Sequence, residues 1–224
     1  MTFLALDTSG TFCVLALAED DGGVQAVSLF QSKRALSRRL LGEVDGLLSR
    51  NGLTLADMTA FAVGLGPGSF TGVRVGVTTA KTLAQVTDKP LVGVGTLDAY
   101  AAALSGLDGA VLPVLPSRRE EVYAAVYEQG ECTEAPFAAP MDAIGERQNV
   151  ILCGDTALLA NWPGPAVFQP WTPPDGLCKI AARRLQNADM DNPFSLVPLY
   201  VVAPTITTPK AAAPKAAAPK AGRT

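Results

Sequence analysis

The residues with the clearest capacity for chemistry lie in a glycine-rich stretch, VGLGPGSFTGVRVG, at positions 63–76. Glycine-rich turns between a strand and a helix often hold phosphate, because the first N–H groups of the helix point at the ligand. A Walker A loop needs G-x-x-x-x-G-K-[ST], and no glycine pair here has that spacing with a following lysine. The fingerprint G-x-G-x-x-G also fails, because Ser69 or Thr71 stands where the third glycine belongs.

The same stretch still predicts a turn that leads into a helix. Pro67-Gly68 suits a type II turn, in which proline fixes φ and glycine takes a positive φ. Ser69 or Thr71 could cap the helix, and the free N–H groups of its first turn could bind an anion. The predicted anion site therefore consists of Gly66, Pro67, Gly68, Ser69 and Thr71.

Other catalytic chemistry is restricted by composition. The chain has no histidine, which excludes Ser-His and Cys-His catalysis and histidine-bound zinc, so no metal site is expected. Its four cysteines form no CxxC pair and are interpreted as reduced thiols. The stretch around Ser69 is not a G-x-S-x-G elbow, and no pair of carboxylates has a spacing that indicates acid–base catalysis.

The elements that would position these residues follow from hydrophobic periodicity and turn signals. Strands are predicted at 3–9, 12–20, 24–32, 59–65 and 91–94, and helices at 36–48, 71–86 and 97–104. Thr96 is the expected cap of the last helix. A meander followed by alternating helices and strands predicts an α/β mixed sheet covered by helices, the order of the ribonuclease-H-like fold of the actin, sugar kinase and Hsp70 superfamily. This analogy concerns the fold and fixes no function.

A looser second unit follows. Its strands are expected at 110–116, 122–129 and 150–155, and its helices at 156–162 and 175–188. The predicted domains are 1–106, a smaller second domain at 107–203 that could be a reduced copy of the first, and a tail at 204–224. Proline at every fifth tail position prevents an alanine helix, so this tail is expected to be extended and disordered.

Within the superfamily analogy, the first hairpin is a second candidate site. An aspartate at this hairpin contacts nucleotide phosphate and metal in the sugar kinases, so Asp7, Thr8 and Ser9 could be a residual nucleotide site. The alternative is that Asp7 is only a turn residue. Asp155, at the end of a strand, could likewise hold a metal or a ribose in an intact kinase, or be only a turn residue. The charged residues at 118–121 could face solvent or a partner.

Glycines inside the two long helices need a separate reason. Gly42 and Gly46 are four residues apart, as are Gly72 and Gly76, and a glycine within a helix costs about 1 kcal/mol relative to alanine. Close approach of another helix would offset that cost. The alternatives are packing of the two helices on each other or a partner surface built on both. The second helix also has two small or apolar faces, so we expect it to be covered on two sides.

Four stretches together resemble the TsaB (YeaZ) family, the bacterial partner subunit in the synthesis of threonylcarbamoyladenosine in tRNA. They are LALDTS, VGLGPGSFTGVRVGVTTAKTLA, PLVGVGTLDAYA and SRREEVYAAVY. The resemblance covers residues 1–127 well and is thinner to about 203, where GD (154–155) and PLY (198–200) fit. The segment from Gly66 to Gly76 is highly specific to the family and its paralogues.

The resemblance implies a non-catalytic subunit that pairs with and activates a TsaD-like threonylcarbamoyltransferase acting on adenosine 37 of tRNA. It implies pairing through the two N-terminal helices, a TsaE-like ATPase in the assembly, and contact with tRNA only through the complex. The implied interface residues are Leu36, Arg39, Gly42, Gly46, Gly72, Arg74, Gly76, Thr79 and Leu83. No cofactor is expected in the isolated chain, although ATP or ADP at the complex interface and a homodimer of the lone chain remain open.

The chain departs from the family pattern at three places. It has Leu36-Ser37 for His-Ser, Pro116-Ser117-Arg118 for Asp-Ala-Arg, and Tyr200-Val201-Val202 for Tyr-Leu-Arg. Side-chain contacts specific to those positions are therefore in doubt.

Charge and hydropathy indicate where in the cell the protein is expected. The net charge is −3 and no apolar run reaches a membrane span, and with no signal peptide apparent a cytoplasmic protein is expected. The runner-up function is an ATP-dependent phosphoryl or acyl transferase of the same superfamily. A glycoprotease-like hydrolase is disfavoured by the absence of histidine.

Overall fold

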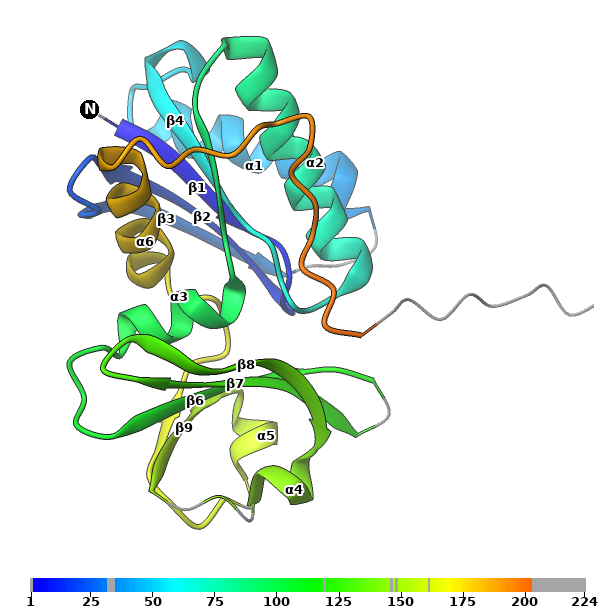
Figure 1. The fold of residues 1–224 in the computed structure, drawn as a ribbon. Helices are drawn as coiled ribbons and strands as arrows, with labels where there is room; N and C mark the ends of the chain where they lie inside the picture. The colour runs from blue at the N-terminus through cyan, green and yellow to red at the C-terminus, as the bar shows by residue number, and fades with distance from the viewer. Residues whose placement is uncertain are drawn as a thin grey trace, which may run out of the picture.

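The structure is a computed structural model that describes residues 2–31, 35–118, 120–145, 147, 149–160 and 162–202. The predicted tail at 204–224 lies outside these residues. Two five-stranded mixed sheets lie one above the other, with helices packed on both faces of the first (Figure 1). Within the described ranges, no helix is long and apolar enough to cross a bilayer.

The first sheet has the strand order β3-β2-β1-β4-β5. Its strands are β1 (Thr2–Asp7), β2 (Phe12–Glu19), β3 (Val24–Gln31), β4 (Met58–Gly64) and β5 (Leu91–Val94). The first three strands form an antiparallel meander, and β4 and β5 add parallel to β1. All five strands were predicted within a few residues.

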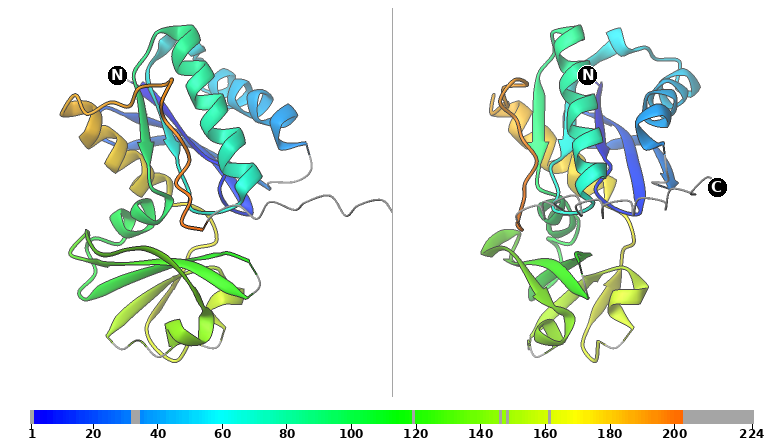
Figure 2. Two further views of the ribbon diagram at one scale, coloured as in Figure 1. Left: turned by 45° about the vertical axis from the view of Figure 1, so that its right-hand side comes forward. Right: turned by 90° about the vertical axis from the view of Figure 1, so that its right-hand side faces the viewer.

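Helices cover the two faces of this sheet because side chains alternate along its strands. Leu4 and Leu6 of β1 belong to the core beneath α1 (Leu36–Arg50) and α2 (Phe70–Thr87). Phe3 and Ala5 point the other way, into a core shared with α6 (Pro174–Gln186). Figures 1 and 2 show α1 and α2 on one side of the sheet and α6 on the other.

The second sheet has the order β10-β9-β6-β7-β8, again a meander extended by parallel strands. Its strands are β6 (Ala110–Pro116), β7 (Glu121–Glu128), β8 (Glu131–Pro140), β9 (Val150–Gly154) and β10 (Ala166–Phe168). The remaining elements are the 3₁₀ helix η1 (Leu55–Asp57), α3 (Thr96–Ala103), α4 (Met141–Gly145) and α5 (Thr156–Leu159). That this sheet is a reduced copy of the first stays a prediction, although the strand orders correspond.

Two features of the second unit escaped prediction. Strand β8 is polar and largely exposed, so its sequence lacks the apolar alternation of a buried strand. Helix α6 falls in the range assigned to the second domain, yet it packs on the first sheet. Its Leu177, Ala181 and Ala182 meet the alanine-rich face of β1 and β2, where small side chains allow a helix to lie close.

Past α6, the chain runs alongside α2 to the junction of the two sheets (Figures 1 and 2). Lys81 Nζ of α2 donates a hydrogen bond to the Leu196 carbonyl at 2.9 Å. The Phe70 and Tyr200 rings pack with centroids 5.5 Å apart. The C-terminal segment, residues 187–202, therefore covers one flank of α2.

Glycine at position 176 is required by the crossing of α3 and α6. A Cβ there would overlap the carbonyl oxygen of Ala99 and lie 3.0 Å from the Ala103 nitrogen. We expect Gly176→Ala to lower the free energy of unfolding by about 1–3 kcal/mol. The matched variant Gly42→Ala, where an added Cβ meets nothing within 4 Å, should raise it by about 1 kcal/mol. Urea unfolding of both variants checks the pair, and equal effects would contradict the close crossing.

Candidate functional site

A buried polar cluster joins the end of β1, the glycine-rich turn and the start of α3. Asp7 is completely buried; its Oδ1 accepts a hydrogen bond from the Ser9 N–H at 2.6 Å, and its Oδ2 accepts one from the Thr96 hydroxyl at 2.8 Å. Thr172 also hydrogen-bonds this carboxyl group. Burial raises the pKa of Asp7, while the hydrogen bonds from Ser9, Thr96 and Thr172 oppose the rise.

The predicted nucleotide site at Asp7, Thr8 and Ser9 lies within this buried cluster. All three residues are buried, and their polar groups bond within the chain. A phosphate could reach Asp7 only if the contact with Thr96 opened. Nucleotide contact here stays a prediction, and the arrangement as it stands is that of a structural cluster.

Thr96 corrects an expectation, because it does not cap α3. The N-cap is Gly95, and Thr96 is the first residue of the helix. Its hydroxyl donates to Asp7 and accepts from the Gly66 N–H at 3.1 Å, while its own N–H donates to the Gly66 carbonyl at 2.7 Å. Thr96 thus ties the glycine-rich turn to β1.

The turn itself differs from the predicted type II turn. The Gly66–Pro67 peptide bond is cis, and the φ of Gly68 is 159° instead of the roughly +80° of a type II turn. The capping prediction is confirmed for Ser69, whose side chain accepts from the Gly72 N–H at 3.2 Å. The Ser69 N–H donates to the Ser9 carbonyl at 2.7 Å. Thr71 is exposed in the first turn of α2.

Gly72 and Gly76 are explained inside the chain. A Cβ at Gly72 would overlap the Thr8 carbonyl oxygen, and one at Gly76 would overlap the Thr8 hydroxyl. That hydroxyl donates to the Gly72 carbonyl at 2.7 Å. The two glycines therefore let α2 approach β1, which corrects the expectation that another helix or a partner approaches α2 at these positions. A larger side chain at Gly76 would therefore disturb the folded monomer itself.

The glycines of α1 behave differently. Gly42 is exposed and has open space around it, and a Cβ at Gly46 would meet only the mobile end of Arg50, at 3.1 Å. Packing within the described chain does not account for either glycine. Arg39 is exposed and forms an ion pair with Glu43 at 2.7 Å.

Of the remaining interface candidates, some are internal. Leu36 and Leu83 belong to the core beneath α1 and α2. Arg74 is exposed and Thr79 is half-buried. The second face of α2, expected to be covered, is open at its end, because Val86 is 72% exposed.

An apolar groove opens between α1 and this side of α2. Its volume is about 340 Å³, and Ser37 of α1 forms part of its wall. The other lining residues belong to α2: Phe70, Thr71, Arg74, Val75, Thr78 and Thr79. Nearby Leu41 on α1 is 54% exposed. This outer face of α1 and α2 is the uncovered apolar surface that lies closest to the predicted partner contacts.

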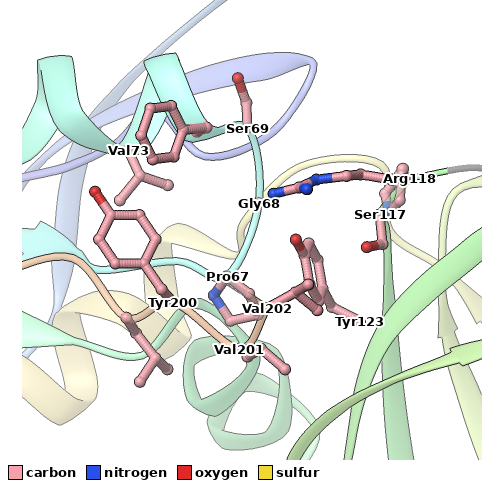
Figure 3. Close-up of a pocket in the computed structure, with 13 residues that line it drawn as sticks. Pro67, Gly68, Ser69, Val73, Ser117, Arg118, Tyr123, Tyr200, Val201 and Val202 are labelled. Atoms are coloured by element: carbon pink, nitrogen blue, oxygen red, sulfur yellow. The ribbon is translucent and has the colours of Figure 1, made fainter. Parts of the chain in front are cut away.

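The outer side of the glycine-rich turn lines a cavity of about 170 Å³ at the junction of the two sheets (Figure 3). The first sheet contributes the turn and the start of α2, the second contributes Ser117, Arg118 and Tyr123, and the C-terminal segment closes the wall. Two of the family departures, Pro116 and Val202, lie on this wall. Sequence reasoning gave no role to Tyr123, although it lies in the stretch SRREEVYAAVY, and it missed Thr172, which lies in no recognisable motif.

The other candidates are structural or exposed. Asp155 caps α5 by accepting from the Ala157 N–H at 3.0 Å, which favours the turn interpretation. Glu120 and Glu121 are exposed, and Arg119 lies outside the described residues. Among described residues, no cluster of acidic or cysteine side chains could hold a metal ion. The four cysteines form no disulfide.

Comparisons with known proteins agree on one family. Residues 24–156 match the model described as "TsaD: tRNA N6-adenosine threonylcarbamoyltransferase". The Bacillus subtilis protein named tRNA threonylcarbamoyladenosine biosynthesis protein TsaB is 34% identical over 75% of this chain and 70% of its own length. A Pseudomonas aeruginosa crystal structure, described as an uncharacterized protein with similarity to peptidase YEAZ, superposes with a TM-score of 0.72. It is 26% identical and covers 90% of this chain and 99% of its own.

A more distant structure shows the fold alone. The activator of the 2-hydroxyisocaproyl-CoA dehydratase from Clostridium difficile, solved with bound ADPNP, gives a TM-score of 0.51 at 10% identity. The match covers 84% of this chain and 98% of that protein. It is consistent with the fold predicted from the order of elements.

The raised pKa of Asp7 makes stability depend on pH. The folded protein binds this proton more tightly than the unfolded chain, so the free energy of unfolding should fall as pH rises from the ordinary value of 3.8 through the raised pKa. Asp7→Asn should flatten this decline, and Asp45→Asn, an exposed change on α1, should not. Urea unfolding across acid and neutral pH measures both, and parallel curves for the wild type and Asp7→Asn would contradict the assignment.

Proposed function

This chain belongs to the TsaB (YeaZ) family, and on that premise we propose that it acts in the synthesis of threonylcarbamoyladenosine in tRNA as a non-catalytic subunit. In this role it pairs with a TsaD-like threonylcarbamoyltransferase and activates it toward adenosine 37. The exposed glycine Gly42 on α1 is the observation that carries the pairing, because its cost in the helix is offset by nothing in the described chain.

A non-catalytic role is supported by the state of the first hairpin. In an intact phosphotransferase of this superfamily the aspartate would face nucleotide and metal, whereas here Asp7 is enclosed by Ser9, Thr96 and Thr172. The chain also lacks histidine, the commonest general base. These features favour a subunit that supports a reaction carried out elsewhere.

The pairing surface in this proposal is the outer face of α1 and α2. Leu41 and Val86 expose more than half of their area there, and the groove beside Phe70 and Val75 is apolar. Burying such a surface against a partner stabilises a complex by roughly 25 cal/mol per Å² of apolar area removed from water. A helix pair of the partner would fit the shape, because glycine lets backbones approach closely.

The rest of the assembly is also part of the proposal. A TsaE-like ATPase would join the pair, tRNA would bind through the complex, and ATP or ADP would sit at the complex interface instead of on this chain alone. With no partner present, the same apolar face could pair two copies of this chain. The proposed setting is the cytoplasm.

The central test is complex formation. Mixing the purified chain with a TsaD-like enzyme at micromolar concentration should give a heterodimer by size-exclusion chromatography with light scattering. The mixture should form threonylcarbamoyladenosine on tRNA faster than the enzyme alone. Absence of both the complex and the acceleration would reject the proposal.

A single substitution locates the surface. Gly42→Leu adds a side chain into open space, so the monomer should remain folded while the partner is held away, with pairing weakened at least about tenfold. Gly106→Leu is the matched control, because a Cβ there also meets nothing within 4 Å and the residue lies beyond α3. Affinities measured by calorimetry should differ between the two variants, and equal affinities would remove α1 from the interface.

A further inference from the structure

The two sheets of the described chain have four edge strands, and three of these are protected against pairing with another strand. In the first sheet β5 is covered by the C-terminal segment. The Asp191 N–H donates to the Leu91 carbonyl at 2.8 Å, and the Gly93 N–H donates to the Asp191 carboxylate at 2.7 Å. In the second sheet, β8 contains two glutamates and two prolines, and β10 has only three residues. The fourth edge strand, β3, has none of these protections.

Strand β3 lies at the edge of the first sheet opposite the C-terminal segment, and no described strand pairs with its outer side (Figure 2). Its eight residues, VQAVSLFQ, include no charged residue and no proline. Val27 and Leu29 are 42% and 41% exposed, and Val27 lies on the α6 face because it pairs with Ala16 of that core. The register shifts at Gln25, which leaves residues 26–31 as the regular part of the edge. This open hydrogen-bonding edge with exposed apolar side chains is typical of a strand that accepts another strand.

We propose that β3 pairs with β3 of a second copy of this chain, antiparallel and centred on Ser28. In this register Val27 lies opposite Leu29 of the other copy on one face of the joined sheet, and residues opposite each other in a sheet pack together. On the other face Ala26 lies opposite Phe30, so that a small side chain meets a large one. Moving the centre by one residue in either direction would place a glutamine opposite an exposed apolar side chain. The pattern around Ser28 is therefore self-complementary in this register.

The charges at the two ends of β3 favour a second copy in this antiparallel orientation. The turn before the strand carries exposed Asp20 and Asp21, and the first turn of α1, past the other end of the strand, carries exposed Arg38 and Arg39. Arg39 is paired with Glu43, which leaves Arg38 as the cation without an ion pair among the described residues. Antiparallel pairing brings the acidic end of one copy toward the basic end of the other, whereas parallel pairing would bring like charges together.

This contact differs from the pairing surface proposed above. It uses the main chain of a sheet edge and two side chains on the α6 face, whereas the proposed pairing with a TsaD-like enzyme uses the outer face of α1 and α2. The inference therefore does not depend on the proposed function, and it is tested with the purified chain alone.

Light scattering of the full chain should show a monomer–dimer equilibrium at high micromolar concentration, because small interfaces associate weakly. Val27→Lys should weaken this association at least about tenfold, since it places a lysine on the pairing edge of both copies. The matched variant Leu41→Lys, an exposed change on the outer face of α1, should associate as the wild type does. A chain that stays monomeric, or one whose association is abolished by Leu41→Lys, would overturn the proposal.

Cysteine cross-linking tests the register without weakening the contact. The full chain with Cys132→Ser is the background, because Cys132 is exposed and the other three cysteines are buried. Ser28→Cys places two thiols at the centre of the paired strands, where Cβ atoms of opposite residues are about 4.5–5.5 Å apart, so a short thiol-specific cross-linker should give a covalent dimer. Gln31→Cys is the matched control on the same edge, because the register separates its two copies by roughly 20 Å along the strands. Equal cross-linking of the two variants, or none with Ser28→Cys, would overturn the proposal.

Discussion

The close approach of α2 to the end of β1 is the constraint on which the rest of this structure depends. Gly72 and Gly76 remove the side chains that would collide with Thr8, and the Thr8 hydroxyl then bonds the Gly72 carbonyl. With α2 held there, the glycine-rich turn before it must pass beside Asp7 and Ser9. Thr96 closes the arrangement by bonding both Asp7 and Gly66. Three segments distant in sequence thus share one buried polar cluster.

This constraint determines which surfaces remain for function. The inner face of α2 is occupied by β1 and its flank by the C-terminal segment, so its other side, next to α1, is left uncovered. The turn, in contrast, faces the second sheet, where its outer side forms one wall of a cavity. One glycine-rich segment therefore contributes to the proposed partner surface on one side and to the cavity at the junction of the two sheets on the other. Phe70 lines both the groove and the cavity, so the two surfaces meet at this side chain.

Under the proposed non-catalytic role, the same arrangement accounts for a kinase-like fold that carries out no kinase chemistry. In this fold the first hairpin is the place where a carboxylate would meet nucleotide, but here burial and three hydrogen-bonding partners enclose Asp7. A buried carboxyl group whose pKa is raised serves packing better than it serves a metal ion. The family membership and the enclosed hairpin thus each lead, independently, to the expectation of a non-catalytic subunit.

The sequence by itself determined the order of elements in the first unit, the first sheet, a cap for α2 at Ser69 or Thr71 and the family, because these depend on local periodicity, capping and motifs. It did not reveal β8 or the return of α6 to the first sheet, since a polar strand and a short amphipathic helix do not specify what they pack against. The spacing of the helical glycines indicated that close packing offsets their cost in the helix, but only the tertiary structure showed which of them pack inside the chain. The four are Gly42, Gly46, Gly72 and Gly76. Gly72 and Gly76 lie against Thr8, whereas Gly42 faces open space and Gly46 faces only the end of the Arg50 side chain. This distinction depends on which atoms lie across from a missing Cβ. The cavity formed by Arg118 and Tyr123 was equally beyond the sequence, because a long-range contact between two sheets creates it.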